Sequence, residues 1–353
     1  MRFFDAHCDA VMHSYDGPFD FVNGDTRPEG TRSHVDLPRL EAGGHCIQLL
    51  AVFASQRYHG ERDVRALARA AIATIHGWVA ESQGRMHLIR SAAELRGACA
   101  DGAPGVGAVI GMEGADPLAN AEELREYFDL GVRLVIPAWD DNHFSGTVFG
   151  GGAGLSAEGQ KLVLLAEELG VMVDVSHASD AAFEEIVGLT RKPFVASHSN
   201  CRAVSASPRN LTDAQIRTLA DRGGVMGLNF APDFLDPDYL AAWNDLMAPM
   251  KDMDPAARQK YRTEVGPRVA AIPLPGLDAI VRQARHAVNI GGEACLGLGG
   301  DLDGIGAMPA GLTGAQDYSR VAEALSAGGF TERQVELICC GNMLRVFGEI
   351  LPG

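Results

Sequence analysis

The chain has 353 residues, a formal net charge of −16 and 46% hydrophobic residues. That hydrophobic content is ordinary for a globular protein, and a chain of this length can bury most of its apolar surface without disulfide bonds. The 46 acidic residues outnumber the 30 basic ones, which argues against a nucleic acid or an anionic membrane surface as a partner.

Neither a membrane span nor a secretion signal is predicted. No stretch approaches the roughly 18 uncharged apolar residues of a transmembrane helix. The N-terminal sequence MRFFDAHCDA lacks the long apolar run and the cleavage site of a signal peptide. The seven cysteines are an odd number without the spacing of a disulfide framework. We therefore expect reduced thiols and a cytoplasmic protein.

Eight short apolar runs, rich in β-branched residues, are predicted to be strands. Several are continuously apolar, as in strands buried on both faces. Helix signals separate them; Ser156, for example, is expected to cap a helix over 157–169 that Gly170 ends. The runs are residues 2–5, 46–53, 106–112, 132–137, 171–175, 194–197, 225–229 and 296–299.

The alternation of strands and helices predicts the fold class. Eight such alternations imply a parallel sheet, and an α/β fold closed into a (β/α)8 TIM-type barrel is the economical arrangement. A doubly wound open sheet is the alternative. Residues 233 to about 275 interrupt the alternation with a segment rich in Met, Trp, Asp and Pro. This segment is expected to hold one or two helices inserted after strand seven.

The insertion has two interpretations. One is a covering appendage, and the other is a functional element, either a lid or a subunit contact. If it is a subunit contact, the protein would be a homodimer. Because no internal repeat and no low-complexity linker divides the chain, residues 1–353 are expected to form a single domain.

Side chains that bind metals or transfer protons follow five of the predicted strands. In a parallel barrel the C-terminal ends of the strands converge on one face, where active sites form. The sequence therefore predicts one convergent site, although each residue alone is a weak signal. The residues are His7 and Asp9 after strand one, Glu113 after strand three, His177 after strand five, His198 after strand six and Asp301 after strand eight.

The residue types in this set favour a metal site. Alternation in a strand puts His7 and Asp9 on the same side, so both can hold one metal; the alternative is an aspartate that only orients a histidine. Glu113 lies between two glycines after an apolar strand, where a carboxylate is costly unless it is paired or metal-bound. Three histidines and two carboxylates suit zinc, with manganese or iron as alternatives, and five ligands suit two metals better than one.

These motifs resemble the membrane (renal) dipeptidase family of zinc metallopeptidases, within the amidohydrolase-like superfamily. The match in order and spacing runs nearly from end to end. It covers His7-x-Asp9, Gly-Met-Glu113-Gly, Asp174-Val-Ser-His177, Ser197-His198-Ser199, Gly-Gly-Asp301-Leu-Asp303-Gly and the C-terminal Gly341-Asn342-Met-Leu-Arg-Val-Phe347.

The resemblance implies two Zn²⁺ ions per chain. His7 and Asp9 would bind the first, His177 and His198 the second, and Glu113 would bridge both. The metals would lower the pKa of a bridging water towards neutrality and so make a hydroxide nucleophile.

The resemblance also assigns residues to the substrate. Asp301 would take the proton from the water and give it to the leaving amine. Arg209, in the segment Ser-Pro-Arg-Asn, would pair with the terminal carboxylate of the substrate, which suits a guanidinium fork. From the residues alone, Arg209 is equally well a surface arginine that caps the helix starting near Thr212.

Two positions depart from the family pattern. Trp139 stands where the family usually has a histidine that polarises the scissile carbonyl, and His143 is expected to reach in as its substitute at the substrate. After strand seven the family often has a tyrosine, whereas this chain has Asn229 and Phe230. Losing one oxyanion donor typically costs about 10²–10³ in rate.

The favoured function is hydrolysis of dipeptides with a free C-terminal carboxylate, including L-Xaa-D-Xaa dipeptides. One rival is a barrel amidohydrolase acting on N-acyl amino acids or cyclic amides, but such enzymes often begin with His-x-His and use a carbamylated lysine as the bridge. The other rival is a non-hydrolytic member of the family, which only Trp139 supports.

Overall fold

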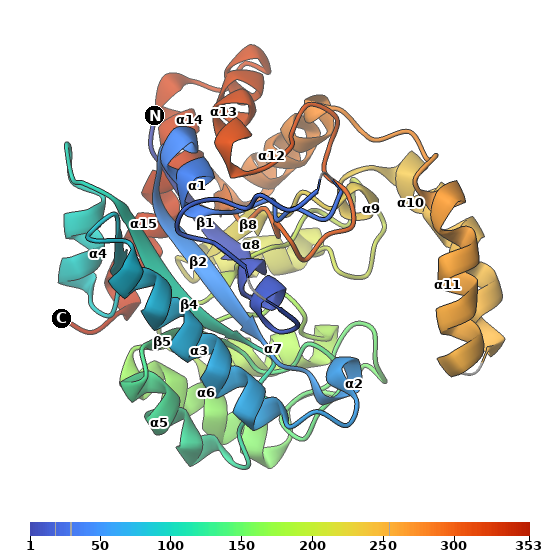
Figure 1. Cartoon of the computed structure of the whole chain (residues 1–353), viewed down its shortest axis with the longest axis horizontal. Helices are drawn as coiled ribbons and strands as arrows, with labels where there is room; N and C mark the ends of the chain where they lie inside the picture. Colours follow the sequence, from blue (N-terminus) through green and yellow to red (C-terminus); the bar gives the residue numbers. More distant parts are fainter. Residues whose placement is uncertain (18, 29, 254) are drawn as a thin grey trace.

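A parallel β-barrel lies at the centre of the molecule (Figure 1). The structure is a computed structural model that describes residues 1–17, 19–28, 30–253 and 255–353. In these ranges eight strands follow the order β6-β5-β4-β2-β1-β9-β8-β7. They are β1 (Phe3–Cys8), β2 (His45–Phe53), β4 (Val106–Glu113), β5 (Val132–Ile136), β6 (Met172–Val173), β7 (Val195–Ala196), β8 (Val225–Leu228) and β9 (Leu296–Leu298).

The two end strands of this order also approach each other. A parallel bridge joins Asp174, just after β6, to Val195 in β7, and the Val175 amide donates to the Val195 carbonyl at 2.8 Å. The barrel is therefore nearly closed, which confirms the predicted (β/α)8 TIM-type fold and makes the open-sheet alternative wrong. The short strand β3 (Met86–Leu88), which was not predicted, pairs with the first half of β4.

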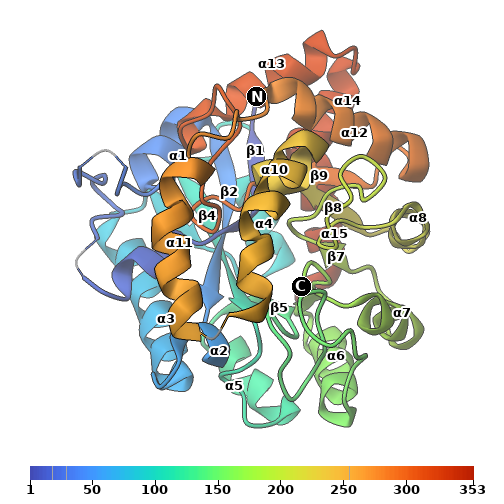
Figure 2. The ribbon, with the colours of Figure 1, turned by 90° about the vertical axis from the view of Figure 1, so that its right-hand side faces the viewer.

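Helices surround the barrel (Figure 2). Ser156 accepts from the Gly159 amide at the start of α6, and Gly170 ends that helix in the left-handed region, as predicted. The longer ones are α1 (Leu37–Gly43), α3 (Val64–Glu81), α4 (Ala92–Ala98), α5 (Leu124–Asp129), α6 (Ala157–Leu169), α7 (Asp180–Leu189), α8 (Asp213–Asp221), α12 (Leu277–Gly291), α13 (Tyr318–Ala327) and α15 (Asn342–Ile350). Shorter helical segments are η1 (Ala10–Ser14), α2 (Gln56–His59), η2 (Ala121–Glu123), η4 (Ala315–Asp317), α14 (Glu332–Glu336) and the π-helical η5 (Leu337–Gly341).

The barrel interior is apolar towards the N-terminal ends of its strands. Alternate residues of a strand face opposite sides, and one set, including Phe4, Ile47 and Val109, forms a buried cluster with α15. Phe347 of α15 packs against Phe4, with 5.1 Å between ring centroids. The C-terminal helix thus closes one end of the barrel and leaves the other end for polar side chains.

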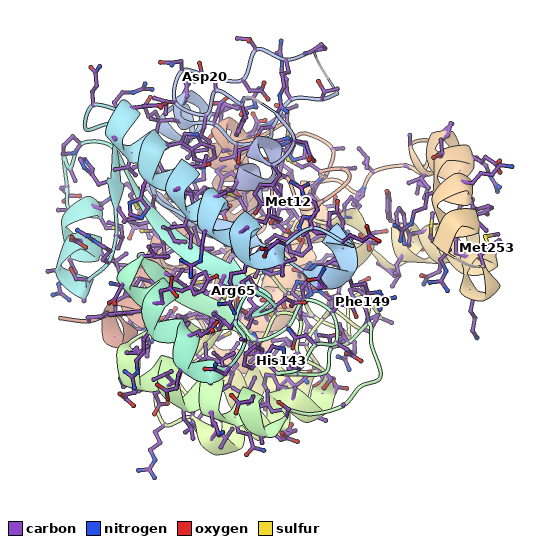
Figure 3. All side chains as sticks on the ribbon, turned by 60° about the horizontal axis from the view of Figure 1, so that its bottom comes forward. Met12, Asp20, Arg65, His143, Phe149 and Met253 are labelled. Carbon is purple, nitrogen blue, oxygen red and sulfur yellow. The ribbon has the colours of Figure 1, made fainter. Side chains whose placement is uncertain are left out.

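The inserted helical segment follows β8, the seventh strand of the barrel, as predicted. It contains α9 (Pro232–Leu235), α10 (Pro237–Met247), η3 (Ala248–Asp252) and α11 (Pro255–Val269). Helices α10 and α11 project from the barrel as an arm, with Met253 at its far end (Figures 1 and 3). Viewed from the side of the arm, both helices lie in front of the barrel end (Figure 2).

All seven cysteines have free thiols. Among the described residues, no helix is both long enough and apolar enough to cross a membrane.

Replacement of Phe347 by Ala tests the closure of the barrel by α15. This side chain is fully buried, so the change should lower the free energy of unfolding by about 3–5 kcal/mol through lost burial and a residual cavity. Urea denaturation measures the effect. Leu164→Ala is the control, because that side chain is 48% exposed and its loss should matter little. Equal stability of the two variants would contradict a structural role for α15.

Candidate metal centre

Three histidines surround one buried carboxylate at the C-terminal ends of the strands. Glu113 ends β4, and its Oε1 lies 3.0 Å from His177 Nε2 and 3.8 Å from His198 Nε2. Its Oε2 lies 3.5 Å from the Nε2 atom of His7, near the end of β1. The Asp9 carboxylate is 3.5 Å from the same His7 nitrogen. All five side chains are buried, so the predicted convergence of these residues is present in the structure.

Several polar atoms in this cluster lack hydrogen-bond partners. Among the described residues, both ring nitrogens of His7, Asp9 Oδ1 and His177 Nδ1 are buried without one. Buried polar atoms are normally paired, so unpaired ones indicate a missing ion or water. His177 Nε2 and His198 Nε2 lie 3.0 Å apart. Zn–N bonds of about 2.0–2.1 Å in a tetrahedral site place two nitrogens about 3.3 Å apart, so this pair fits one metal.

The protonation states of two of the three histidines, His177 and His198, suit metal binding, whereas Glu113 and Asp9 raise the pKa of His7. Burial and the nearby Arg209 lower the pKa of His177 to about 4. Burial, with His7 and Arg209, lowers the pKa of His198 as well. Both rings are therefore neutral near pH 7, which is the form that binds metals. Burial alone would raise the pKa of Glu113, but the neighbouring His7 and His177 hold it below its ordinary value, so the carboxylate is ionised.

Two buried aspartates hold the histidine-bearing segments in place. Asp174 Oδ1 accepts from the Ser176 amide at 2.9 Å and the Ser197 amide at 3.1 Å, and so ties the segments after β6 and β7 together. Asp5 accepts from the His7 amide, the Gly300 amide and the Tyr318 hydroxyl. Such outer contacts orient metal ligands and are needed for affinity.

Asp301 lies beside the cluster on an unusual backbone. Its φ of +58° is in the left-handed region, which aspartate tolerates better than most residues. Its Oδ1 is 4.0 Å from His7 Nε2, while Oδ2 accepts from Asn229 Nδ2 at 2.8 Å. Burial raises the pKa of Asp301 to about 6, with Glu113 acting in the same direction. Asn229, one of the departures from the family pattern, therefore holds this carboxylate.

Arg209 is buried at the same site. Its side chain is 3% exposed, and Nη2 donates to the His198 carbonyl at 3.2 Å and lies 3.4 Å from His177 Nε2. Nη1 donates to the Ser176 carbonyl. The interpretation of Arg209 as a surface helix cap is therefore wrong, because the residue is buried beside the histidines.

A cavity of about 710 Å³ opens over the cluster. Asp9, Glu113, His177, Arg209 and Asp301 line its polar part. Met12 and Phe149, both labelled in Figure 3, line its apolar walls. The walls also include Phe53, Tyr58, Trp139, Tyr239, Trp243 and Val269. Since Tyr239, Trp243 and Val269 belong to α10 and α11, the insertion covers the site.

The structure places Trp139 in the cavity wall but His143 outside the cavity. The Trp139 ring lies 4.9 Å from the Phe53 ring and 6.1 Å from the His177 ring, so it forms part of the cavity wall. His143 is exposed and is absent from the described lining, which corrects the expectation that it reaches in. The reason is local: Asn142 Oδ1 accepts from the Phe144 and Ser145 amides and holds a turn with the His143 ring outside.

Sequence reasoning gave no role to two charged residues of the cavity lining, Asp233 and Asp303. Asp233 lies in the lining, and burial raises its pKa to about 6. Asp233 lies four residues after the predicted strand 225–229. This position just beyond a strand end was the only feature of the sequence that pointed to a place in the site.

The fold and the cluster together define a barrel hydrolase that depends on a metal. The family model for membrane dipeptidases, peptidase family M19, matches residues 1–351. The chain therefore belongs to this family, and it is a metallodipeptidase.

Three similar proteins illustrate the relationship. A Klebsiella pneumoniae protein described as uncharacterised, in the pqqA 5′ region, is 31% identical over 288 residues, which is 79% of this chain and 94% of that protein. The structure of a dipeptidase from metallopeptidase family M19 has a TM-score of 0.83 at 26% identity and covers 100% of this chain and 99% of its own. A Rhodobacter sphaeroides metallopeptidase, liganded with a phosphinate mimic of L-Ala-D-Ala, has a TM-score of 0.82 at 25% identity and covers 99% of both chains.

Glu113→Gln should weaken metal binding, because one charged oxygen is lost beside His7 and another beside His177 and His198. The loss should exceed the roughly 10- to 100-fold that removal of an outer contact costs. Elemental analysis after gel filtration measures it. Glu94→Gln, at a partly exposed helix position away from the cluster, is the control. Full metal retention by Glu113→Gln would show that Glu113 is not a shared ligand.

Proposed function

We propose that the protein hydrolyses dipeptides with a free C-terminal carboxylate, including L-Xaa-D-Xaa dipeptides. The observation that carries the proposal is the position of Arg209, whose guanidinium lies 3.4 Å from a ring nitrogen of His177 in the same cavity. A substrate carboxylate paired with this fixed cation would have its neighbouring peptide bond beside the metal ligands. The L-Ala-D-Ala mimic bound by the similar R. sphaeroides enzyme supports this substrate class.

We further propose two zinc ions per chain. His7 and Asp9 would hold one, His177 and His198 the other, and Glu113 would bridge them. Five ligands around one central carboxylate favour this arrangement over a single tetrahedral ion. When bound, the two ions would lower the pKa of a water towards neutrality and polarise the scissile carbonyl.

Asp301 is the proposed proton-transfer residue. Asn229 holds its Oδ2, which leaves Oδ1 on the side of His7 and the cavity. A carboxyl with a raised pKa can accept a proton from the attacking water and return it to the leaving nitrogen. The same burial that raises the pKa also keeps bulk water from competing for this proton.

Trp139 is proposed to contact the substrate as an apolar wall. Together with Phe53 and Tyr58 it forms an aromatic surface beside His177. Its indole N–H can donate one hydrogen bond but carries no charge. An apolar substrate side chain against this wall fits the lining better than a charged one.

The free thiols and the uninterrupted chain support proposals for the cellular compartment and the domain organisation. Seven free cysteines are typical of a reducing compartment, so we propose a cytoplasmic protein. We also propose that residues 1–353 act as a single domain, with α10 and α11 as a cover over the cavity.

Asp301→Asn should lower kcat by about 10²–10⁴-fold and leave metal content nearly unchanged, because the amide keeps the shape but cannot accept the proton. Activity on an L,D dipeptide and elemental analysis of the same sample measure both effects. Asp16→Asn, at an exposed position, is the control. Loss of metal together with activity would make Asp301 a ligand instead.

Amidation of the dipeptide C-terminus should lower kcat/KM by roughly 10- to 150-fold. The amide leaves the buried guanidinium without its charged partner, and a hydrogen bond to a charged group contributes about 1.5–3 kcal/mol. Each 1.4 kcal/mol corresponds to about a tenfold change, which gives the expected range. Arg209→Ala should cost a similar factor for the free acid and much less for the amide.

Arg217→Ala is the matched control for this experiment, because Arg217 is an exposed arginine of α8, the helix that follows the Arg209 segment. Equal turnover of the acid and the amide by the unmodified enzyme would contradict the proposed binding of the substrate carboxylate by Arg209. It would favour an amidohydrolase that does not recognise this carboxylate.

A further inference from the structure

Three cysteines from distant parts of the chain meet at the other end of the barrel. Cys46 is the second residue of β2, Cys99 follows α4, and Cys340 lies in the π-helical segment η5. Cys46 Sγ is 3.3 Å from Cys99 Sγ and 3.5 Å from Cys340 Sγ, and all three sulfurs lie within 4.8 Å of one another. The sequence predicted only separate reduced thiols, because 53 and 294 residues separate these contacts along the chain.

This cluster is separate from the dipeptidase site. Phe53, at the far end of β2, lines the cavity over the histidines. Seven residues at about 3.3 Å each place Cys46 about 23 Å away from it along the strand. Anything that binds to the cysteines is therefore independent of the catalytic metals.

A positive charge lies beside the three sulfurs. The Arg2 guanidinium donates to the Cys99 carbonyl and pairs with Asp101 at 3.2 Å. The thiolate is the form of cysteine that binds metals. Packing of cysteines as small apolar side chains requires neither a nearby guanidinium nor three sulfurs that face one another.

The sulfur spacing suits an ion better than a disulfide. Tetrahedral Zn–S bonds of about 2.3 Å place two sulfurs about 3.8 Å apart, a few tenths of an ångström beyond the observed contacts. A disulfide needs a separation of about 2.05 Å and would leave the third cysteine unpaired. Soft thiolate ligands select Zn²⁺, Cd²⁺ and Cu⁺ over hard cations such as Mg²⁺.

We propose that Cys46, Cys99 and Cys340 form a three-thiolate site for a thiophilic cation of the Zn²⁺ class. Binding of a divalent ion to three thiols releases three protons and leaves one net negative charge near the Arg2 guanidinium. Cys340 is partly exposed, so an ion can enter from solvent. The fourth position of a tetrahedral ion is left for water.

The site has a structural role. It joins the start of β2 and the end of α4 to the segment that leads into α15, the helix that closes this end of the barrel. In such barrels this end serves stability, whereas the opposite end carries the chemistry. A bound ion should therefore raise the temperature of unfolding and leave kcat/KM unchanged.

Cadmium titration of the full-length, chelator-treated protein tests the proposal. Thiolate-to-cadmium charge transfer gives an ultraviolet absorption that imidazole and carboxylate ligands do not give. We expect it to saturate at one Cd²⁺ per cysteine cluster and to be lost in Cys340→Ala. Cys339→Ala is the matched control, because this adjacent cysteine is fully buried and is outside the cluster.

The same titration separates this site from the dipeptidase centre. Glu113→Gln, which disturbs the histidine site, should keep the full cadmium–thiolate absorption. With Zn²⁺, elemental analysis should find one ion fewer in Cys340→Ala than in Cys339→Ala, and the unfolding temperature should rise by a few degrees more in the control. An absorption that is absent from the unmodified protein, or equal in both cysteine variants, would overturn the proposal.

A measurement without substitutions covers the case in which Cys340→Ala does not fold. Alkylation of Cys340 by iodoacetamide, followed by peptide mass spectrometry, should slow several-fold when Zn²⁺ is added and recover when it is chelated. Unchanged alkylation would count against the site. A disulfide between any two of the three cysteines in protein isolated from cells would identify a redox pair and overturn the metal proposal.

Discussion

The Glu113 carboxylate, buried among three histidines, is the constraint on which the rest of the site depends. An isolated charge in an apolar barrel is strongly unfavourable, so it has to be matched by positive charge. Its two oxygens face different histidines, at 3.0 Å from His177 and 3.5 Å from His7. Ring nitrogens of His7 and His177 beside it have no hydrogen-bond partner among the described residues, and the metal ions we propose here would supply further positive charge.

The two ends of the barrel divide structure from chemistry. At the N-terminal ends of the strands, apolar side chains pack against α15, and the cysteine cluster lies beside them. At the C-terminal ends, short segments present charged groups that would be too costly in the apolar part. Asp5 and Asp174 mark the boundary, because each is fully buried and uses its carboxylate to hold the backbone of a ligand-bearing segment. The ligands are thus positioned by the barrel rather than by flexible loops.

The substrate side of the site combines a fixed cation with aromatic walls. Arg209 is buried and tied to two backbone carbonyls, so its charge has a set position relative to the histidines. Trp139 and the residues of α10 and α11 shape the remaining space. In the proposed function, the charge of Arg209 would set the register of a dipeptide, and the apolar walls would set the preference among its side chains. The insertion after β8 would contribute to that preference, because Tyr239, Trp243 and Val269 line the cavity.

The sequence alone determined the barrel, because continuously apolar runs and helix caps such as Ser156 are local signals that tertiary contacts did not override. It also predicted that the five candidate ligands converge, since parallel strands bring their C-terminal ends together. Only the tertiary structure decided that Arg209 is buried, that a local turn keeps His143 outside the cavity, and that Asp233 lines it. The three clustered cysteines were likewise invisible in sequence. Their contacts join residues far apart in the chain, and no periodic pattern records which distant side chains meet when a barrel closes.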